Sequence, residues 1–363
     1  MRLGVAAAVV DGRLLQGDIE VEGVSVAAVG VGGSGSGVAL PGFVDIHTHG
    51  YDGVDFGSAS TDEMEIASRA LTATGVTGFQ PTLLTLDESE FRNALAVHAS
   101  ANYEGAAFLG THLEGPFLSP DYPGAHDPAL LRTPDLDFCQ RLVDAGRVGQ
   151  MTIAPELPGA FELIGFLVQS GSAVAVGHSN AETAAAHRAF DSGARILTHV
   201  FNAMRPFSHR DPGVGGVALT RPDVFISAVV DNVHLSKEAT LLAMGVGADR
   251  FLVVTDAMSG TGRGDGTFQL GNREVTVRGR EARLADGTIA SSVLTMDAAL
   301  RNLVDLGWEL PQASAALAST PARAIGRPDV GAINVGSRAD IVVVDDELRV
   351  LSTYVSGVEM YRR

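Results

Sequence analysis

The chain alternates between short apolar runs and longer stretches with helical signals, and this alternation restricts its fold more than any other feature. The apolar runs occupy residues 42–50, 76–85, 107–117, 150–156, 173–180, 194–204, 225–235 and 251–260. Such runs, separated by helical segments, predict parallel strands joined by crossover helices. Eight units over roughly 290 residues predict an α/β fold, a (β/α)8 barrel of the TIM type, which typically has ~250 residues.

Local signals support the helices between these runs. Capping boxes are predicted at Ser60 with Glu63 and at Ser179 with Glu182, and Gly193 is expected to end a helix. A doubly wound open sheet is the competing fold. It would place a glycine-rich phosphate loop after the first strand, and the sequence "HTHGYDG" at that point is not such a loop.

Both ends of the chain carry short strand-like runs. Residues 30–37, "GVGGSGSG", indicate a flexible turn or linker. Because the strands at either end are too few to fold alone, we expect residues 1–40 and 336–363 to build one small β-sandwich domain. The barrel would then occupy residues 41–335 as the catalytic domain.

Charge and cysteine content exclude some classes of partner. The 363 residues include 43 Asp and Glu against 26 Lys and Arg, a net charge of −17, which argues against nucleic acid or an anionic membrane as the main partner. The single cysteine, Cys139, cannot form an intrachain disulfide. No apolar segment approaches the ~18 residues of a membrane-spanning helix, so we expect a cytoplasmic protein.

Polar residues with metal-binding or proton-transfer chemistry follow the apolar runs where the strands are expected to end. They are His47, His49, Glu114, His178, His199, His234 and Asp256. His47 and His49 share one strand face because the side-chain period of a strand is two. A single histidine in an apolar strand is more often a hydrogen-bonded core residue than a ligand. In a barrel, however, all these positions converge on the face that carries the active site.

Five of these residues form a ligand set for a divalent ion: His47, His49, Glu114, His178 and His199. Four imidazoles and one carboxylate suit Zn²⁺ best, with Fe²⁺, Mn²⁺, Co²⁺ or Cd²⁺ as alternatives. Glu114 could bridge two ions or serve one. Asp256 ends the apolar run "FLVVTDA" and is interpreted as a carboxylate poised to move protons, with a hydrogen-bonded structural role as the alternative.

Three polar residues in or near loops also stand out. His126 and His209 lie where neither core packing nor helix geometry explains them, and loops on this face of a barrel tend to bind substrate. Arg210 suits phosphate because its planar guanidinium donates two parallel hydrogen bonds, with a salt bridge to Asp211 as the alternative. His112 shares a strand face with Glu114 and is expected behind the site or inside the barrel.

Taken in order, these motifs resemble the amidohydrolase superfamily, and within it the N-acetylglucosamine-6-phosphate deacetylases. The resemblance runs from residue 41 to about residue 345 and rests on "PGFVDIHTHG", "THLEGPF", "VGHSNA", "THVFNAMRPFSHRDPGVGG", "DNVHL", "VTDAM", "GTIASSVLTMDAAL" and "STPARAIG". The first motif and a final one, "GAINVGSRADIVVVD", are shared widely in the superfamily, whereas "HLEGPF", the segment through Arg210 and the DxxH spacing in "DNVHL" are specific to the deacetylases. Asn232 stands where glycine is common in that family.

The resemblance implies a metal-dependent hydrolase that removes acetate from N-acetylglucosamine 6-phosphate. It gives metal-ligand roles to Glu114, His178 and His199, leaves His47 and His49 for a second ion, and makes Asp256 the acid/base with His126 as a hydrogen-bond donor to the oxyanion. Substrate contacts are implied at Ala125, His126, Asn202, Ala203, Arg210, His234, Ile289, Ala290 and Ser291. A homodimer is also expected, because several family members bind phosphate with help from the neighbouring subunit.

Other functions stay open at this point. The chain could be a deacetylase for N-acetylgalactosamine 6-phosphate, or a hydrolase of N-acyl amino acids. A catalytically silent barrel that acts as an interaction protein is a further alternative, although such a protein would have no need to keep the complete ligand set together with Asp256.

Overall fold

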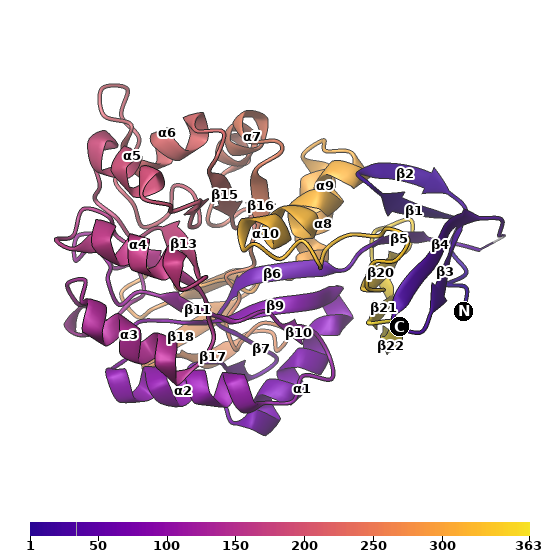
Figure 1. Ribbon diagram of the computed structural model, residues 1–363, viewed down its shortest axis with the longest axis horizontal. Helices are drawn as coiled ribbons and strands as arrows, with labels where there is room; N and C mark the ends of the chain where they lie inside the picture. Colours follow the sequence, from indigo (N-terminus) through magenta and orange to yellow (C-terminus); the bar gives the residue numbers. More distant parts are fainter. Residues whose placement is uncertain (34) are drawn as a thin grey trace.

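The computed structural model describes residues 1–33 and 35–363 and contains the predicted (β/α)8 barrel (Figure 1). Parallel strands follow one another around the barrel in chain order. They are β6 (Phe43–Thr48), β9 (Val76–Leu83), β11 (Thr111–Glu114), β12 (Val148–Ile153), β13 (Ala173–Val176), β14 (Ile196–Leu197), β15 (Phe225–Ala228) and β16 (Phe251–Val253). The short strand β10 (Ala107–Phe108) also pairs with β9. All eight predicted strands are confirmed, although several end earlier than their apolar runs.

Helices connect the strands and cover the outside of the barrel (Figure 1). They are α1 (Thr61–Leu71), α2 (Glu88–Ser100), α3 (Leu136–Ala145), α4 (Ala160–Gln169), α5 (Thr183–Asp191), α6 (Gly213–Thr220), α7 (Lys237–Val246), α8 (Met296–Asp305), α9 (Leu310–Leu317) and α10 (Ser319–Ala324), with 3-10 turns at Thr72–Thr74 and Pro128–Leu130. Every residue of β6 and β9 is buried, as expected for strands covered on both sides.

The local helix signals were right in two cases and wrong in one. Ser60 and Glu63 form the predicted capping box of α1, and Gly193, with a φ of 111°, follows the end of α5. The capping box predicted at Ser179 is wrong, because α5 begins later, with Glu182 at its N-cap. The Ser179 hydroxyl instead donates to Glu156 at 2.8 Å.

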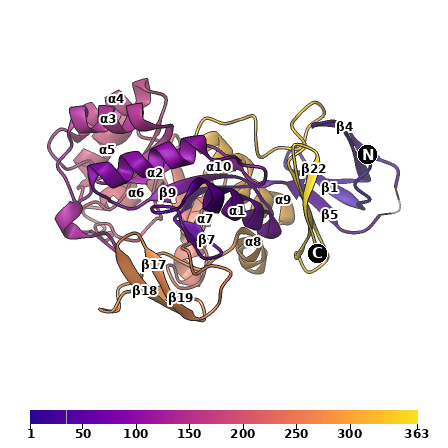
Figure 2. The ribbon, with the colours of Figure 1, turned by 90° about the horizontal axis from the view of Figure 1, so that it is seen from below.

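The two ends of the chain meet in one six-stranded sheet beside the barrel (Figures 1 and 2). Its order is β2 (Arg13–Gln16), β1 (Ala7–Val10), β5 (Val38–Pro41), β20 (Ile341–Val344), β21 (Val350–Val355) and β22 (Val358–Arg362). A ribbon of β3 (Asp18–Glu22) and β4 (Ser25–Val31) packs against it through a separate small core that includes Ile19, Val26 and Ile341. The linker expected at 30–37 follows within this unit, and its Ser34 lies outside the described residues.

A three-stranded antiparallel sheet follows the last barrel strand and was not predicted. It consists of β17 (Gly266–Leu270), β18 (Arg273–Arg278) and β19 (Glu281–Arg283), and it projects from one side of the barrel (Figure 2). Its buried face packs with Leu84 and Ala125 from the barrel loops. The sheet thereby holds the following turn, Thr288–Ser291, over the strand ends. A further small hairpin, β7 (Gly50–Tyr51) with β8 (Val54–Asp55), follows β6.

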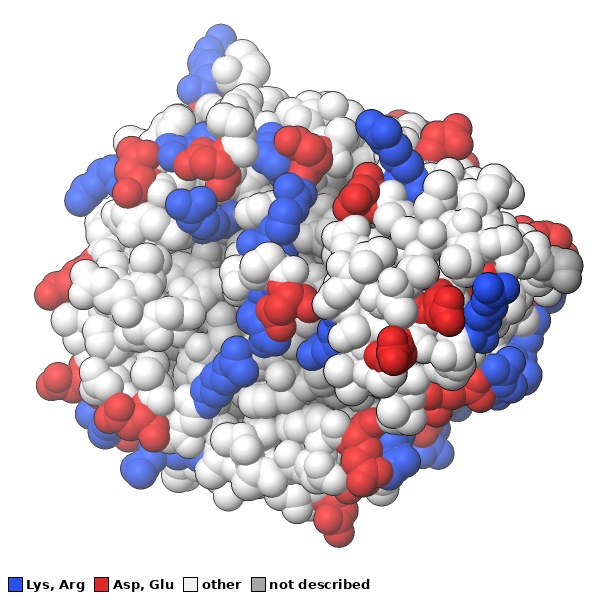
Figure 3. Space-filling view, turned by 45° about the vertical axis from the view of Figure 1, so that its right-hand side comes forward, with Lys and Arg blue, Asp and Glu red and all other residues white. Residues whose placement is uncertain are grey.

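The molecular surface carries charges of both signs. On the face drawn in Figure 3, acidic and basic side chains are interspersed over a largely uncharged surface. Within residues 1–33 and 35–363, no helix is both long and apolar enough to cross a membrane.

Candidate active site

A cavity of about 240 Å³ opens at the carboxyl ends of the barrel strands. Twelve of the residues singled out in the sequence line it: His49, Glu114, Ala125, His126, His178, His199, Asn202, Ala203, His234, Asp256, Ile289 and Ser291. These residues come from six strand ends or the loops after them, and from the turn behind β19. The convergence expected for the C-terminal face of a barrel is therefore present.

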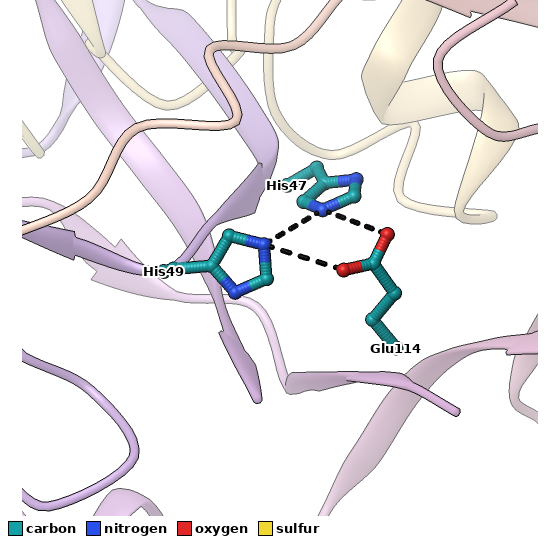
Figure 4. A group of neighbouring side chains, drawn as sticks. All are labelled: His47, His49 and Glu114. Atoms are coloured by element: carbon teal, nitrogen blue, oxygen red, sulfur yellow. Dashed lines mark hydrogen bonds and ion pairs between the residues drawn. The ribbon is translucent and has the colours of Figure 1, made fainter. Parts of the chain in front are cut away.

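One group of possible metal ligands consists of His47, His49 and Glu114, whose ligand atoms lie within 4.8 Å of one another (Figure 4). The Nε2 atoms of His47 and His49 are 3.1 Å apart, and each is 3.4 Å from one Glu114 oxygen. Both histidines point the same way because one residue separates them on β6 and the turn after it.

A second group consists of Glu114, His178 and His199. The Nε2 atoms of the two histidines lie 3.1 and 3.2 Å from Glu114 Oε1. Nδ1 of His178 lies 2.9 Å from the carbonyl oxygen of Tyr122. Because a carbonyl only accepts, Nδ1 carries the hydrogen and Nε2 presents its lone pair to the cluster, which is the arrangement of a metal-binding histidine.

The electrostatics of the cluster favour a cation. Burial alone would raise the pKa of Glu114, but His47 and His178 outweigh it and hold the pKa well below the usual range. Burial alone would likewise lower the pKa of His49, yet Asp256 and Glu114 raise it to about 10. Two buried carboxylates thus attract positive charge among imidazole nitrogens, and this donor set fits a divalent ion.

Asp256 lies beside the first group. Its Oδ1 is 3.1 Å from His49 Nε2 and 3.5 Å from His47 Nε2, and it accepts a hydrogen bond from the Ser291 hydroxyl at 3.3 Å. Burial would raise the pKa of Asp256, but the neighbouring His47 and His49 lower it below its usual range. Asp256 is therefore an ionised carboxylate on the cavity wall, able to accept a proton.

His126 also contacts Glu114, at the oxygen that His49 approaches. Its Nδ1 accepts the backbone N–H of Thr85 at 3.1 Å, and its Nε2 is 3.2 Å from Glu114 Oε2. Burial lowers the pKa of His126 to about 4, so the ring is neutral at pH 7. With Nδ1 acting as acceptor, the hydrogen is on Nε2, which makes His126 a donor toward the cavity.

Several site residues have backbone conformations that side chains seldom adopt. The φ angles are 46° at His178, 26° at His199, 52° at Asp256 and 60° at Ser291. Such conformations persist only where the surrounding structure imposes them, and they concentrate at functional sites. Gly124 is required by close approach, because a Cβ atom there would lie 2.9 Å from Cε1 of His178.

Three of the residues singled out do not line the cavity. His47 is buried within the first ligand group, and Ala290 is fully buried with its N–H donating to Ala282 O. Arg210 is exposed in the loop before α6. The alternative salt bridge with Asp211 is wrong: Asp211 pairs with Arg205 at 3.0 Å and accepts hydrogen bonds from Thr183.

The remaining candidate histidines lie outside the cavity. His209 is exposed beside Arg210, whereas His112 is fully buried and hydrogen-bonds Thr82 and Thr152 inside the barrel. Sequence reasoning missed Leu84, Gly124 and Thr288, which line the cavity but carry no ionisable side chain. It also assigned no role to Asp231, although the spacing of Asp231 and His234 was visible in "DNVHL".

Comparison with known proteins identifies the family of the chain. The profile of the Amidohydrolase family matches residues 38–360. A solved structure of an N-acetyl-D-glucosamine-6-phosphate deacetylase variant from Mycobacterium smegmatis, in complex with N-acetyl-D-glucosamine-6-phosphate, superposes with a TM-score of 0.95 at 35% identity over 99% of both chains.

Two curated relatives show similar agreement in sequence. The N-acetylglucosamine-6-phosphate deacetylase of Mus musculus is 37% identical over 89% of this chain and 83% of its own length. The N-acetylgalactosamine-6-phosphate deacetylase of Escherichia coli O157:H7 is 34% identical over 87% of this chain and 86% of its own length. The chain therefore belongs to the amidohydrolase family, and within it to the group that contains the N-acetylglucosamine-6-phosphate deacetylases.

Proposed function

We propose that this protein hydrolyses N-acetylglucosamine 6-phosphate to acetate and glucosamine 6-phosphate. The observation that carries the proposal is the position of Asp256: its carboxylate is 3.1 Å from His49 Nε2 and lines the same cavity as Glu114 and His126. A carboxylate beside a metal-ligand cluster, with a neutral imidazole donor in the same cavity, provides the groups that amide hydrolysis requires.

We further propose that the resident ion is Zn²⁺, held by Glu114, His178 and His199, with His47 and His49 available to a second ion. The mixed imidazole and carboxylate donor set supports this choice. A divalent ion in such a site lowers the pKa of water and polarises a carbonyl oxygen.

Asp256 moves the proton in this scheme. Its carboxylate accepts a proton from the attacking water as the new C–O bond forms at the acetamide carbon. It then gives this proton to the sugar nitrogen as the C–N bond breaks, so that acetate and the free amine leave. The low pKa of Asp256 keeps the carboxylate ionised and ready for the first transfer.

His126 stabilises the negative charge on the former carbonyl oxygen. Its Nε2–H is a donor because Nδ1 is occupied by the N–H of Thr85. The neutral ring donates without needing to gain a proton, and a buried donor of this kind acts strongly in a site that excludes water.

We infer that Arg210 binds the 6-phosphate in a second copy of the chain within a homodimer. Arg210 and the 60% exposed Phe207 project from the loop before α6, while Arg205 and Asp211 fasten the ends of that loop. An exposed guanidinium suits the phosphate of a substrate held in the cavity of the other subunit. The remaining predicted contacts, Ala125, Asn202, Ala203, His234, Ile289 and Ser291, line the cavity of the same chain.

N-acetylgalactosamine 6-phosphate is a second candidate substrate, favoured by the similarity to a deacetylase for that sugar. The experiment is to measure acetate release from both phosphorylated sugars and from unphosphorylated N-acetylglucosamine, using protein assayed for bound metal. We expect fast release only from N-acetylglucosamine 6-phosphate. Faster release from N-acetylgalactosamine 6-phosphate would make that sugar the substrate instead. No release of acetate from either sugar by metal-loaded protein would overturn the proposal.

A further inference from the structure

We propose that Asp231 is a positioning residue that fixes the ring and the tautomer of His234, so that Nε2 of His234 acts as a hydrogen-bond acceptor in the cavity. This inference rests on the proposed function for its kinetic part. It extends that function by assigning a role to a buried carboxylate that itself does not line the cavity.

Asp231 is held rigidly just beyond β15. Its side chain is 5% exposed, and its Oδ1 accepts the backbone N–H groups of Val233 and His234, both at 2.8 Å. The intervening Asn232 has a φ of 63°, a left-handed conformation that asparagine tolerates better than most residues. The turn therefore survives the replacement of the glycine common in this family, and it locks the carboxylate in one orientation.

The second oxygen of this carboxylate faces the histidine ring. Oδ2 of Asp231 lies 2.7 Å from Nδ1 of His234. A carboxylate only accepts, so the hydrogen of this contact is on Nδ1. In the neutral ring the opposite nitrogen, Nε2, then carries a lone pair.

Nε2 of His234 points to the reaction side of the site. His234 lines the cavity, and its Nε2 is 3.9 Å from Oδ2 of Asp256. Two acceptors at this separation suit a donor placed between them, and the N-acetyl sugar offers an amide N–H and neighbouring O–H groups. Asp231 would thus orient the substrate next to the acid/base through His234, without touching the substrate itself.

The substitution Asp231→Asn separates this role from a structural one. The asparagine Oδ1 can still accept the N–H groups of Val233 and His234, which keeps the turn. Its NH₂ group would then face Nδ1 of His234, and because NH₂ donates, Nδ1 must become the acceptor and the hydrogen must move to Nε2. The variant should keep the fold and invert the tautomer.

The experiment combines nitrogen-15 NMR of the histidine rings with steady-state kinetics on the metal-loaded enzyme. The wild-type spectrum should show His234 with a protonated Nδ1 and an unprotonated Nε2. In Asp231→Asn these two signals should exchange, with unchanged metal content and unfolding temperature, while kcat/KM falls by about 10- to 100-fold. The control is Asp249→Asn, whose side chain is 88% exposed and which should change neither readout.

Three results would overturn the inference: a wild-type His234 with its hydrogen on Nε2, an inverted tautomer with unchanged kcat/KM, or loss of bound metal in Asp231→Asn. The wild-type spectrum tests the tautomer even if the variant does not fold. If the wild-type protein releases no acetate, the proposed function fails, but the spectrum still decides the role of Asp231.

Discussion

Asp45 and Thr255 join the first and last strands of the barrel: the Thr255 hydroxyl donates to Asp45 Oδ2 at 2.5 Å. Oδ1 of Asp45 accepts the backbone N–H groups of His47 and Thr255, both at 3.3 Å. The chain continues from Thr255 into Asp256, whose N–H donates to His47 O at 2.8 Å. The contact that closes the barrel therefore also sets His47 beside Asp256, the residue proposed as the acid/base.

Replacing Thr255 by valine should weaken this closure. The change keeps the side-chain shape but removes a donor from the fully buried Asp45, whose pKa burial already raises to about 7. A buried polar group that loses its partner costs about 1–3 kcal/mol, so the free energy of unfolding should fall by that amount in chemical denaturation. Thr255→Ser, which keeps the hydroxyl, should be close to wild type; equal losses in both variants would contradict this role.

His98 should make the protein less stable in acid. Its Nε2 donates to Phe56 O and its Nδ1 pairs with Thr111, and burial lowers its pKa from 6.5 to about 4. The unfolded chain binds a proton at His98 below pH 6.5 while the folded chain does not, so stability is lost as the pH falls from 6.5 to 4. The loss from this group is about 3 kcal/mol.

Denaturation at a series of pH values checks the contribution of His98. His98→Gln should show a shallower fall in unfolding free energy between pH 6.5 and pH 4 than wild type. The exposed His187 supplies the matched control, since His187→Gln should leave the slope unchanged. A slope in His98→Gln equal to that of wild type would show that other groups cause the acid sensitivity.

Glu114→Gln should remove most of the bound metal. Glu114 is the residue shared by both ligand groups, and a neutral amide cannot supply the negative charge that balances the ion. Metal content per chain, measured by elemental analysis after gel filtration, should fall well below half of the wild-type value. Glu182→Gln, at a side chain that is 71% exposed, is the control; full metal occupancy in Glu114→Gln would place the ion elsewhere.

Arg210→Met and Asp256→Asn should complement each other if Arg210 serves the partner's cavity. Each variant alone should be weakly active on the phosphorylated sugar. After mixed refolding, half of the dimers are heterodimers with one complete site, so activity should recover to about one quarter of wild type. Heterodimers that form without recovering activity would place the phosphate contact within one chain.

Much of the barrel follows from local patterns in the sequence. The apolar runs are strands because parallel barrel strands are buried on both sides, and the histidines of "HTH" share a face because of the two-residue period. The sheet β17–β19 was missed because its strands lie outside the barrel and alternate exposed and buried residues. They therefore lack the continuous apolar runs by which the barrel strands were predicted. The cap assigned to Ser179 failed because Glu156, distant in sequence, takes its hydroxyl hydrogen.

The site residues likewise include some that the sequence predicts and others that it does not. Reactive side chains at strand ends could be found, since their chemistry is visible in the sequence. Leu84 and Gly124 could not, because they matter only through the space they fill or leave open. The exposed position of Arg210 outside the cavity could not be read from its spacing in the sequence either.

The most direct measurement is the rate of acetate release from N-acetylglucosamine 6-phosphate by the metal-loaded wild-type protein and by Asp256→Asn. We predict rapid release by the wild type and a turnover lower by about 10²-fold or more in the variant, with fold and metal content retained, as loss of a general acid/base causes. Near-normal turnover in Asp256→Asn would contradict the assignment of Asp256 as the group that moves the proton.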